Sequence, residues 1–261
     1  MRTMPRFAAN LSLLFTEYPL LQRVQAAARA GFAAVEVQFP YEHEPDAWRA
    51  ALDGAGVPLV LHNLPAGDWA AGERGIACHP DRIDEFRAGV QHALRWAVPL
   101  QVPRLNVIAG VAPAHVPQVE ARQVLIDNLR YAARQLQPHG IQLLLEPINT
   151  FDIPGFFVHR TVQALDIVDD VGEPNVALQY DLYHAQRMEG ELIGTLRRHM
   201  ARIGHVQIAD NPGRHEPGSG EIRWEAVLDE LDRLGYTGWV GCEYRPAAGT
   251  EAGLGWMQRW R

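Results

Sequence analysis

Short β-rich runs alternate with longer helical patterns from one end of this 261-residue chain to the other. Eight runs are nearly continuous in apolar residues, which is typical of parallel strands buried on both faces. These expected strands are Phe7–Leu11, Ala34–Phe39, Pro58–Asn63, Arg104–Ala109, Gln142–Glu146, Val176–Asp181, His205–Ala209 and Trp239–Glu243. Apolar residues at helical spacing predict helices between them, including Leu20–Ala30, Pro80–Trp96, Val119–Gln137 and Thr161–Val171.

Glycine stands just past the end of several of these helical patterns. A helix that ends in a left-handed residue favours glycine at that position, because glycine has no Cβ to clash. The expected helix ends are Ala30-Gly31, Ala55-Gly56, His139-Gly140, Val171-Gly172 and Leu234-Gly235.

Eight strand–helix units predict a closed (β/α)8 TIM barrel, formed by residues 1–261 as a single domain. An open doubly wound sheet is the alternative fold for such an alternation. That fold usually has a glycine-rich turn after its first strand, whereas the turn here reads Leu11-Ser12-Leu13-Leu14.

Charge and composition exclude several classes of partner. The chain has 24 basic and 31 acidic residues, a net charge of −7, which disfavours binding to duplex nucleic acid. Its apolar stretches are shorter than the roughly 20 residues that cross a membrane as a helix. The two cysteines, Cys78 and Cys242, cannot form a disulfide framework, which fits a reducing compartment. We therefore expect a cytoplasmic protein with no nucleic-acid or membrane partner.

Polar side chains stand at the carboxyl ends of four consecutive expected strands: Glu146, Asp181, Gln207 and Glu243. In a closed barrel these ends meet on one face, where the catalytic groups of such barrels lie. Three neighbouring carboxylates repel one another unless a cation lies between them. Oxygen ligands of this kind suit Mg²⁺, or alternatively Mn²⁺. The alternative interpretation is that each acid caps a helix or pairs with a nearby arginine.

Other residues are placed to contact a bound small molecule near these strand ends. His62 ends the third expected strand, and His184 follows Asp181 by three residues. Arg74 and Arg214 could hold an anionic group through two parallel hydrogen bonds. The long segment Leu64–His79, which contains Arg74, is expected to cover the substrate as a lid or wall.

Several segments resemble the hydroxypyruvate isomerase family, which belongs to the xylose-isomerase-like barrels. The two most specific are LHNLPAGDWAAGERGI at residues 61–76 and the stretch that runs from EPIN at residues 146–149 to Phe151–Phe156. The others are Gln179–Asp181, His205–Pro212 and Gly241–Tyr244, so that the resemblance covers nearly the whole chain.

This resemblance implies reversible conversion of hydroxypyruvate to 2-hydroxy-3-oxopropanoate (tartronate semialdehyde), through a cis-enediolate. It implies one divalent metal ion held by Glu146, Asp181, Gln207 and Glu243, with Glu146 and Glu243 also acting as acid and base. Related epimerases often have His where Gln207 stands. It further places Asp152, His184 and Arg214 in contact with the substrate, a small hydroxy-keto acid.

Other functions stay open from the sequence. The nearest are a 2-oxo-tetronate isomerase and a ketose 3-epimerase, and hydride transfer is the alternative to proton transfer. A metal-dependent phosphodiesterase or endonuclease is more distant, because it needs more metal ligands and a basic groove. A barrel that binds carbohydrate without chemistry does not explain four polar strand ends. A homo-oligomer is possible.

Overall fold

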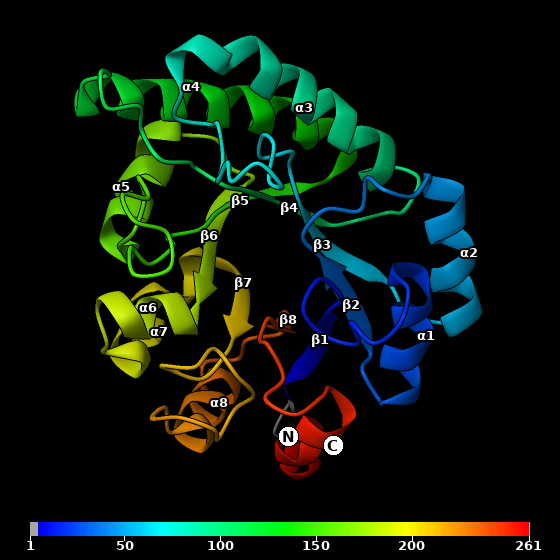
Figure 1. Ribbon diagram of the computed structural model, residues 1–261. Coiled ribbons are helices and arrows are strands. Elements are labelled where there is room, and N and C mark those ends of the chain that lie inside the picture. The colour runs from blue at the N-terminus through cyan, green and yellow to red at the C-terminus, as the bar shows by residue number, and fades with distance from the viewer. Residues whose placement is uncertain (1–4, 261) are drawn as a thin grey trace.

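The computed structural model describes residues 5–260, in which eight parallel strands close into a barrel that helices surround (Figure 1). Each strand pairs with the next along the chain, and β8 pairs with β1. The strands are β1 Arg6–Asn10, β2 Ala34–Val37, β3 Leu59–Asn63, β4 Arg104–Val107, β5 Gln142–Leu145, β6 Val176–Asp181, β7 Ile203–Ile208 and β8 Trp239–Cys242. The predicted (β/α)8 barrel is thus confirmed, with strand ends that lie within two residues of the predicted ones.

The helices lie outside the barrel and follow the order expected from the sequence (Figure 1). They are α1 Leu20–Arg29, α2 Pro45–Ala55, α3 Ile83–Ala97, α4 Gln118–Leu136, α5 Thr161–Val171, α6 Leu182–Met188, α7 Leu192–His199 and α8 Trp224–Arg233. Short 3₁₀ turns are η1 Pro80–Arg82, η2 Gln137–His139 and η3 Met200–Arg202, and a longer one is η4 Glu251–Trp260. Within residues 5–260, none of these helices is long and apolar enough to cross a membrane.

Glycine ends the helices as expected. Gly172 follows α5 with a φ of +70°, and Gly56 follows α2 with a φ of +68°. These left-handed conformations are unfavourable for residues with a Cβ, and they let each helix stop and turn toward the next strand.

Alternation along each strand separates two environments. Leu143 and Leu145 belong to the large apolar core that also contains buried residues of the helices. The intervening Leu144 belongs to a small separate cluster with Leu61 and Ala177, all three on strands. Alternate residues of a barrel strand face the interior, so this small cluster fills space inside the barrel. Buried polar side chains, among them Glu36, Gln179 and Gln207, lie nearer the carboxyl ends of the strands.

The long segment 64–79 leaves the barrel at the carboxyl end of β3. It approaches the segment after β4 closely, because Gly75 and Gly110 both have a φ of +104° and a Cβ on either would overlap the other segment's backbone. At the other end of the chain, η4 lies beside β1, where Trp256 contacts Phe7 edge to face at 5.1 Å between ring centroids (Figure 1). The single-domain organisation of residues 1–261 stays a prediction.

Candidate active site

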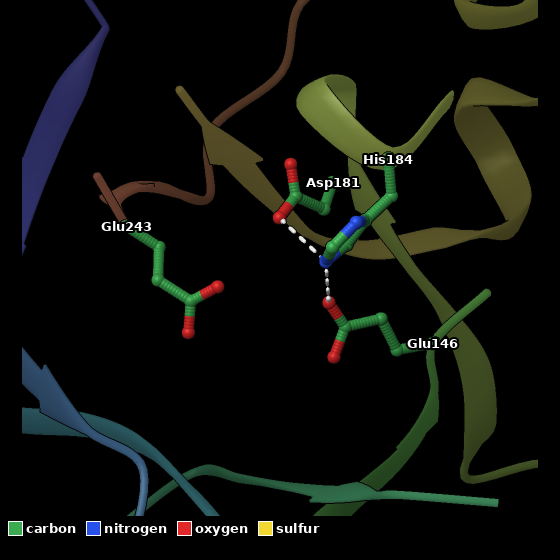
Figure 2. Close-up of side chains that lie close together, drawn as sticks. All are labelled: Glu146, Asp181, His184 and Glu243. Carbon is green, nitrogen blue, oxygen red and sulfur yellow. Dashed lines mark ion pairs between the residues drawn. The ribbon is translucent and has the colours of Figure 1, made fainter. Parts of the chain in front are cut away.

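Four buried polar side chains meet at the carboxyl ends of β5, β6 and β8. Glu146, Asp181 and Glu243 follow or end these strands, and His184 lies in the first turn of α6. One ligand atom from each lies within 4.8 Å of the others, so the cluster could hold a metal ion. Figure 2 shows the carboxylates of Glu146 and Asp181 on either side of the His184 ring, with Glu243 directed toward them from across the barrel.

Burial raises the pKa of every carboxyl group in this cluster. For Glu146 burial is the main cause, and repulsion from Glu243 and Asp181 adds to it. Burial likewise raises the pKa of Asp181 to about 7 and raises the pKa of Glu243. A carboxyl group with a raised pKa takes up a proton more readily near neutral pH than an ordinary one, which suits acid–base catalysis.

Arg214 brings the compensating positive charge into the cluster. Its Nη2 lies 2.6 Å from Glu243 Oε2 and 3.9 Å from Asp181 Oδ2, and its guanidinium lies over the Tyr183 ring at 5.2 Å. Arg214 itself has a positive φ of +55°. A loop after β7 therefore directs this side chain back into the barrel.

Amide side chains on or directly after other strands orient the two glutamates. Asn106 on β4 donates from Nδ2 to Glu146 Oε2 at 2.8 Å. Gln38 and Asn10 donate to Glu243 Oε1 at 3.0 and 3.1 Å. Each carboxylate is thus held by donors on one side, and its remaining oxygen faces the cluster or Arg214.

The hydrogen bonds around Asn149 determine which ring nitrogen of His184 carries the proton. Asn149 Oδ1 accepts from the backbone N–H groups of Phe151 and Asp152, so its Nδ2 is the atom that lies 2.6 Å from His184 Nδ1. Nδ1 therefore accepts, and burial lowers the pKa of His184 well below its ordinary value. The neutral ring carries its proton on Nε2, the atom that faces Glu146 and Asp181 at 3.8 and 3.6 Å. In this arrangement His184 is a hydrogen-bond donor rather than a metal ligand.

Gln207 lies on β7 in register with Asp181 on β6. It is buried, its Oε1 accepts from Gln179 at 2.7 Å, and its Nε2 donates to Glu36 at 2.7 Å. The predicted fourth ligand therefore lies on the strand between Asp181 and Glu243, with its amide orientation fixed by these two neighbours.

The other expected substrate-binding residues lie in different surroundings. His62 is buried on β3, where burial lowers its pKa to about 4, and its Nε2 has no hydrogen-bond partner among residues 5–260. Asp152 accepts from the Tyr183 hydroxyl at 2.9 Å and from Asn149 at 3.1 Å. Arg74 bonds to the carbonyls of Trp69 and Glu73 within its own loop and lies over the Trp69 ring at 4.4 Å.

The residues around the cluster that were not predicted from the sequence include Asn10, Glu36, Gln38, Asn106 and Asn149. Glu36 had a detectable signal, because it interrupts the apolar run Ala34–Val37 with a charged residue. A charge in a strand buried on both faces requires a partner inside the protein. The three asparagines had no comparable signal, since asparagine near a strand end is common in turns.

The donor set fits a hard divalent cation. Three carboxylates and one amide oxygen are the ligand types that Mg²⁺ and Mn²⁺ take. Asp181 Oδ2 is buried and has no hydrogen-bond partner within residues 5–260. An ionised carboxylate oxygen in that position is stabilised by a cation.

Comparisons with known proteins agree with this architecture. The family model of the xylose isomerase-like TIM barrel matches residues 24–260. Hydroxypyruvate isomerase of Escherichia coli K12 is 51% identical over 99% of this chain and 100% of its own length. A 2-oxo-tetronate isomerase of Cupriavidus necator is 47% identical over 98% of both chains.

A solved structure shows the same fold in detail. The crystal structure from Brucella melitensis described as an AP endonuclease of family 2 is 45% identical, with a TM-score of 0.96 over 99% of this chain and all of that one. The resemblance expected from the sequence motifs is confirmed. The chain belongs to the xylose isomerase-like TIM barrel family.

Proposed function

We propose that this protein is an isomerase that interconverts hydroxypyruvate and 2-hydroxy-3-oxopropanoate, with Glu146 and Glu243 as the proton-transferring groups. The observation that carries the proposal is the convergence of Glu146, Asp181 and Glu243 in one buried cluster. The similarity over full length to the E. coli hydroxypyruvate isomerase supports the choice of substrate.

The reaction moves one proton between neighbouring carbons. A base removes a proton from C3 of hydroxypyruvate to give a cis-enediolate, and an acid returns a proton to C2, while the hydroxyl proton moves from the C3 oxygen to the C2 oxygen. Glu146 and Glu243 approach the cluster from β5 and β8, on different sides of the barrel. One glutamate can therefore accept the proton while the other donates one, and such catalysis contributes about 10²–10⁴-fold.

We propose that one divalent ion, Mg²⁺ or alternatively Mn²⁺, is held by Glu146, Asp181, Gln207 and Glu243. When bound, it would supply positive charge beside the substrate oxygens on which negative charge develops. Asp181 acts only as a ligand in this proposal. One of its oxygens accepts from the Tyr183 backbone N–H, and the other faces the cluster.

Substrate contacts are proposed for five residues. His184 donates from Nε2 to a substrate oxygen, since that N–H faces the cluster. His62 offers its Nε2, which has no hydrogen-bond partner in the described part of the chain, and Arg214 offers a guanidinium at the edge of the cluster. Asp152, which accepts from the Tyr183 hydroxyl, and Arg74, which bonds within the long loop, are the other two proposed contacts. The loop 64–79 would exclude water from the enediolate.

Partners other than the small substrate are not part of this proposal. We expect a cytoplasmic enzyme that binds no nucleic acid, and a homo-oligomer is compatible with the sequence. The net charge of −7 disfavours the binding of an anionic substrate. The positive charges of Arg214 and Arg74 near the site are therefore important for holding it.

Isomerisation in D₂O tests the proposal directly. Purified protein is incubated with hydroxypyruvate and Mg²⁺ or Mn²⁺, and the product is analysed by NMR and mass spectrometry. We expect 2-hydroxy-3-oxopropanoate with deuterium at C2. Complete retention of substrate hydrogen would indicate hydride transfer. If the protein turns over a four-carbon 2-oxo-tetronate but not hydroxypyruvate, the 2-oxo-tetronate is the substrate instead.

A further inference from the structure

Glu36 is a fully buried carboxylate in the barrel interior that takes part in none of the proposed chemical steps. It lies on β2 and has no exposed surface. Its two oxygens accept three hydrogen bonds, from Asn10 Nδ2 at 2.9 Å, Gln207 Nε2 at 2.7 Å and His205 Nε2 at 2.7 Å. These donors belong to β1 and β7, so the carboxylate connects opposite parts of the barrel.

Two of these donors also connect Glu36 to the proposed ligands. Asn10 Nδ2 lies within hydrogen-bond distance of both Glu36 Oε1 and Glu243 Oε1, and so bridges the two carboxylates. Gln207 is itself a proposed ligand, and Glu36 receives the N–H of its amide. Because Glu36 accepts from the Gln207 N–H, the Gln207 carbonyl points away from Glu36, and its Oε1 accepts from Gln179.

The backbone makes room for this carboxylate. Gly241 on β8 is in register with Gln207 on β7, and a Cβ on Gly241 would overlap both Glu36 oxygens. The φ of Gly241 does not require glycine, because it is not among the positive values. The absence of a side chain there is thus explained by the space that Glu36 needs.

We propose that Glu36 is a positioning residue, which orients Gln207 directly and Glu243 through Asn10. The inference rests on the proposed metal-assisted function and deepens it. Hydrogen-bond partners of ligands fix the ligand orientation in metal sites, and their loss typically costs 10–100-fold in metal affinity or activity.

The first test is Glu36→Gln, with Glu230→Gln as the matched control. The substituted amide would present N–H donors to Gln207 and Asn10, so that the Gln207 amide would lose its acceptor and with it the orientation in which its Oε1 accepts from Gln179. Glu230 is also a buried glutamate, but it lies on α8 and pairs with Arg197 and Arg233 on the helical surface. Mn²⁺ affinity is measured by isothermal titration calorimetry without substrate, and kcat and KM are measured with hydroxypyruvate.

We expect Glu36→Gln to bind Mn²⁺ about 10–100-fold more weakly than wild type and to lose kcat, whereas Glu230→Gln keeps both values. The double variant Glu36→Gln/Gln207→Glu exchanges donor and acceptor, and we expect it to recover part of the lost affinity. Gly241→Ala removes no polar group but displaces the Glu36 carboxylate. It should reproduce the loss of affinity, and it replaces Glu36→Gln if that variant does not fold.

Unchanged Mn²⁺ affinity and kcat in Glu36→Gln or Gly241→Ala would overturn the inference, as would a double variant no better than Glu36→Gln. If wild type binds no Mn²⁺, the metal part of the proposed function fails by itself. In that case kcat tests whether Glu36 positions Glu243. A loss of kcat confined to the Glu36 and Gly241 variants supports that role, and an unchanged kcat contradicts it.

Discussion

The guanidinium of Arg214 and the carboxylate of Glu243 form a close ion pair, with 2.6 Å between Nη2 and Oε2. The same nitrogen lies 3.9 Å from Asp181 Oδ2, so one cation faces two of the three clustered carboxylates. The sequence motifs predict that Arg214 holds the substrate. Its position in the fold adds a second role, because it offsets the repulsion among carboxylates that burial would otherwise make unfavourable.

Arg214→Met should destabilise the protein most strongly when divalent cations are removed by EDTA. Removing one partner of a buried ion pair leaves a charge uncompensated, and we expect a loss of about 3 kcal/mol in the free energy of unfolding. Mg²⁺ should then raise the melting temperature of the variant more than that of wild type, because the ion replaces the missing positive charge. Differential scanning calorimetry with and without Mg²⁺ measures both effects, and equal Mg²⁺-induced shifts would argue against charge compensation by Arg214.

Glu146→Gln and Glu243→Gln should each lose about 10²–10⁴-fold in kcat and keep the fold. Glutamine fills the same space and keeps a hydrogen-bonding oxygen, but it cannot accept and return a proton at neutral pH. Turnover of hydroxypyruvate is measured alongside far-UV circular dichroism, with the exposed Glu225→Gln as the control. Near-normal activity in either variant would remove that glutamate from the mechanism.

Asn149→Leu should reduce kcat/KM about tenfold, the equivalent of one hydrogen bond. Without the Asn149 side-chain N–H at 2.6 Å, only the longer contact of the Asn149 backbone N–H, 3.5 Å from His184 Nδ1, favours the proton on Nε2. The ring can then also present its unprotonated nitrogen to the cluster. The ¹⁵N chemical shifts of His184 report which nitrogen is protonated, and we expect the Nε2–H form in wild type and a mixture in the variant. The Nε2–H form persisting alone in the variant would show that Asn149 does not select it.

The pH dependence of stability should differ between the metal-free and metal-bound protein. The pKa of Asp181 is raised from its ordinary 3.8 to about 7, mainly by burial, so the folded state holds a proton that the unfolded state releases between these values. The contribution of Asp181 to the stability of the metal-free protein should therefore fall as pH rises from about 4 to 7. The buried His62 and His184 contribute in the opposite direction up to their ordinary pKa of 6.5, because burial lowers their pKa values. Metal binding requires ionised carboxylates, so the Mg²⁺-induced rise in melting temperature should be larger at pH 8 than at pH 5.5. Thermal melts at both pH values, with and without Mg²⁺, check this, and a Mg²⁺ effect independent of pH would contradict it.

The barrel was predictable because its information is local. Alternation of apolar runs, helical spacing and terminal glycines such as Gly172 depend on neighbouring residues, and eight strand–helix units leave few ways to close. The direction of Glu146, Asp181, Gln207 and Glu243 followed from the same reasoning, since the carboxyl ends of parallel strands meet on one face. The proposed roles of these residues stay predictions.

Contacts between distant strands were beyond the sequence. Glu36 and His205 are 169 positions apart and hydrogen-bond across the barrel interior, a relation that no local pattern encodes. The Nε2–H form of His184 likewise depends on how the turn after β5 directs the Asn149 amide.

The sequence by itself determined the fold, the face on which the polar strand ends gather and the family. Only the tertiary structure decided which side chains orient those ends, which nitrogen of His184 carries its proton, and that Arg214 pairs with Glu243. The physical reason is that strand periodicity fixes the direction of a side chain within its own strand. Hydrogen-bond geometry and desolvation depend on neighbours that only the closed barrel brings together.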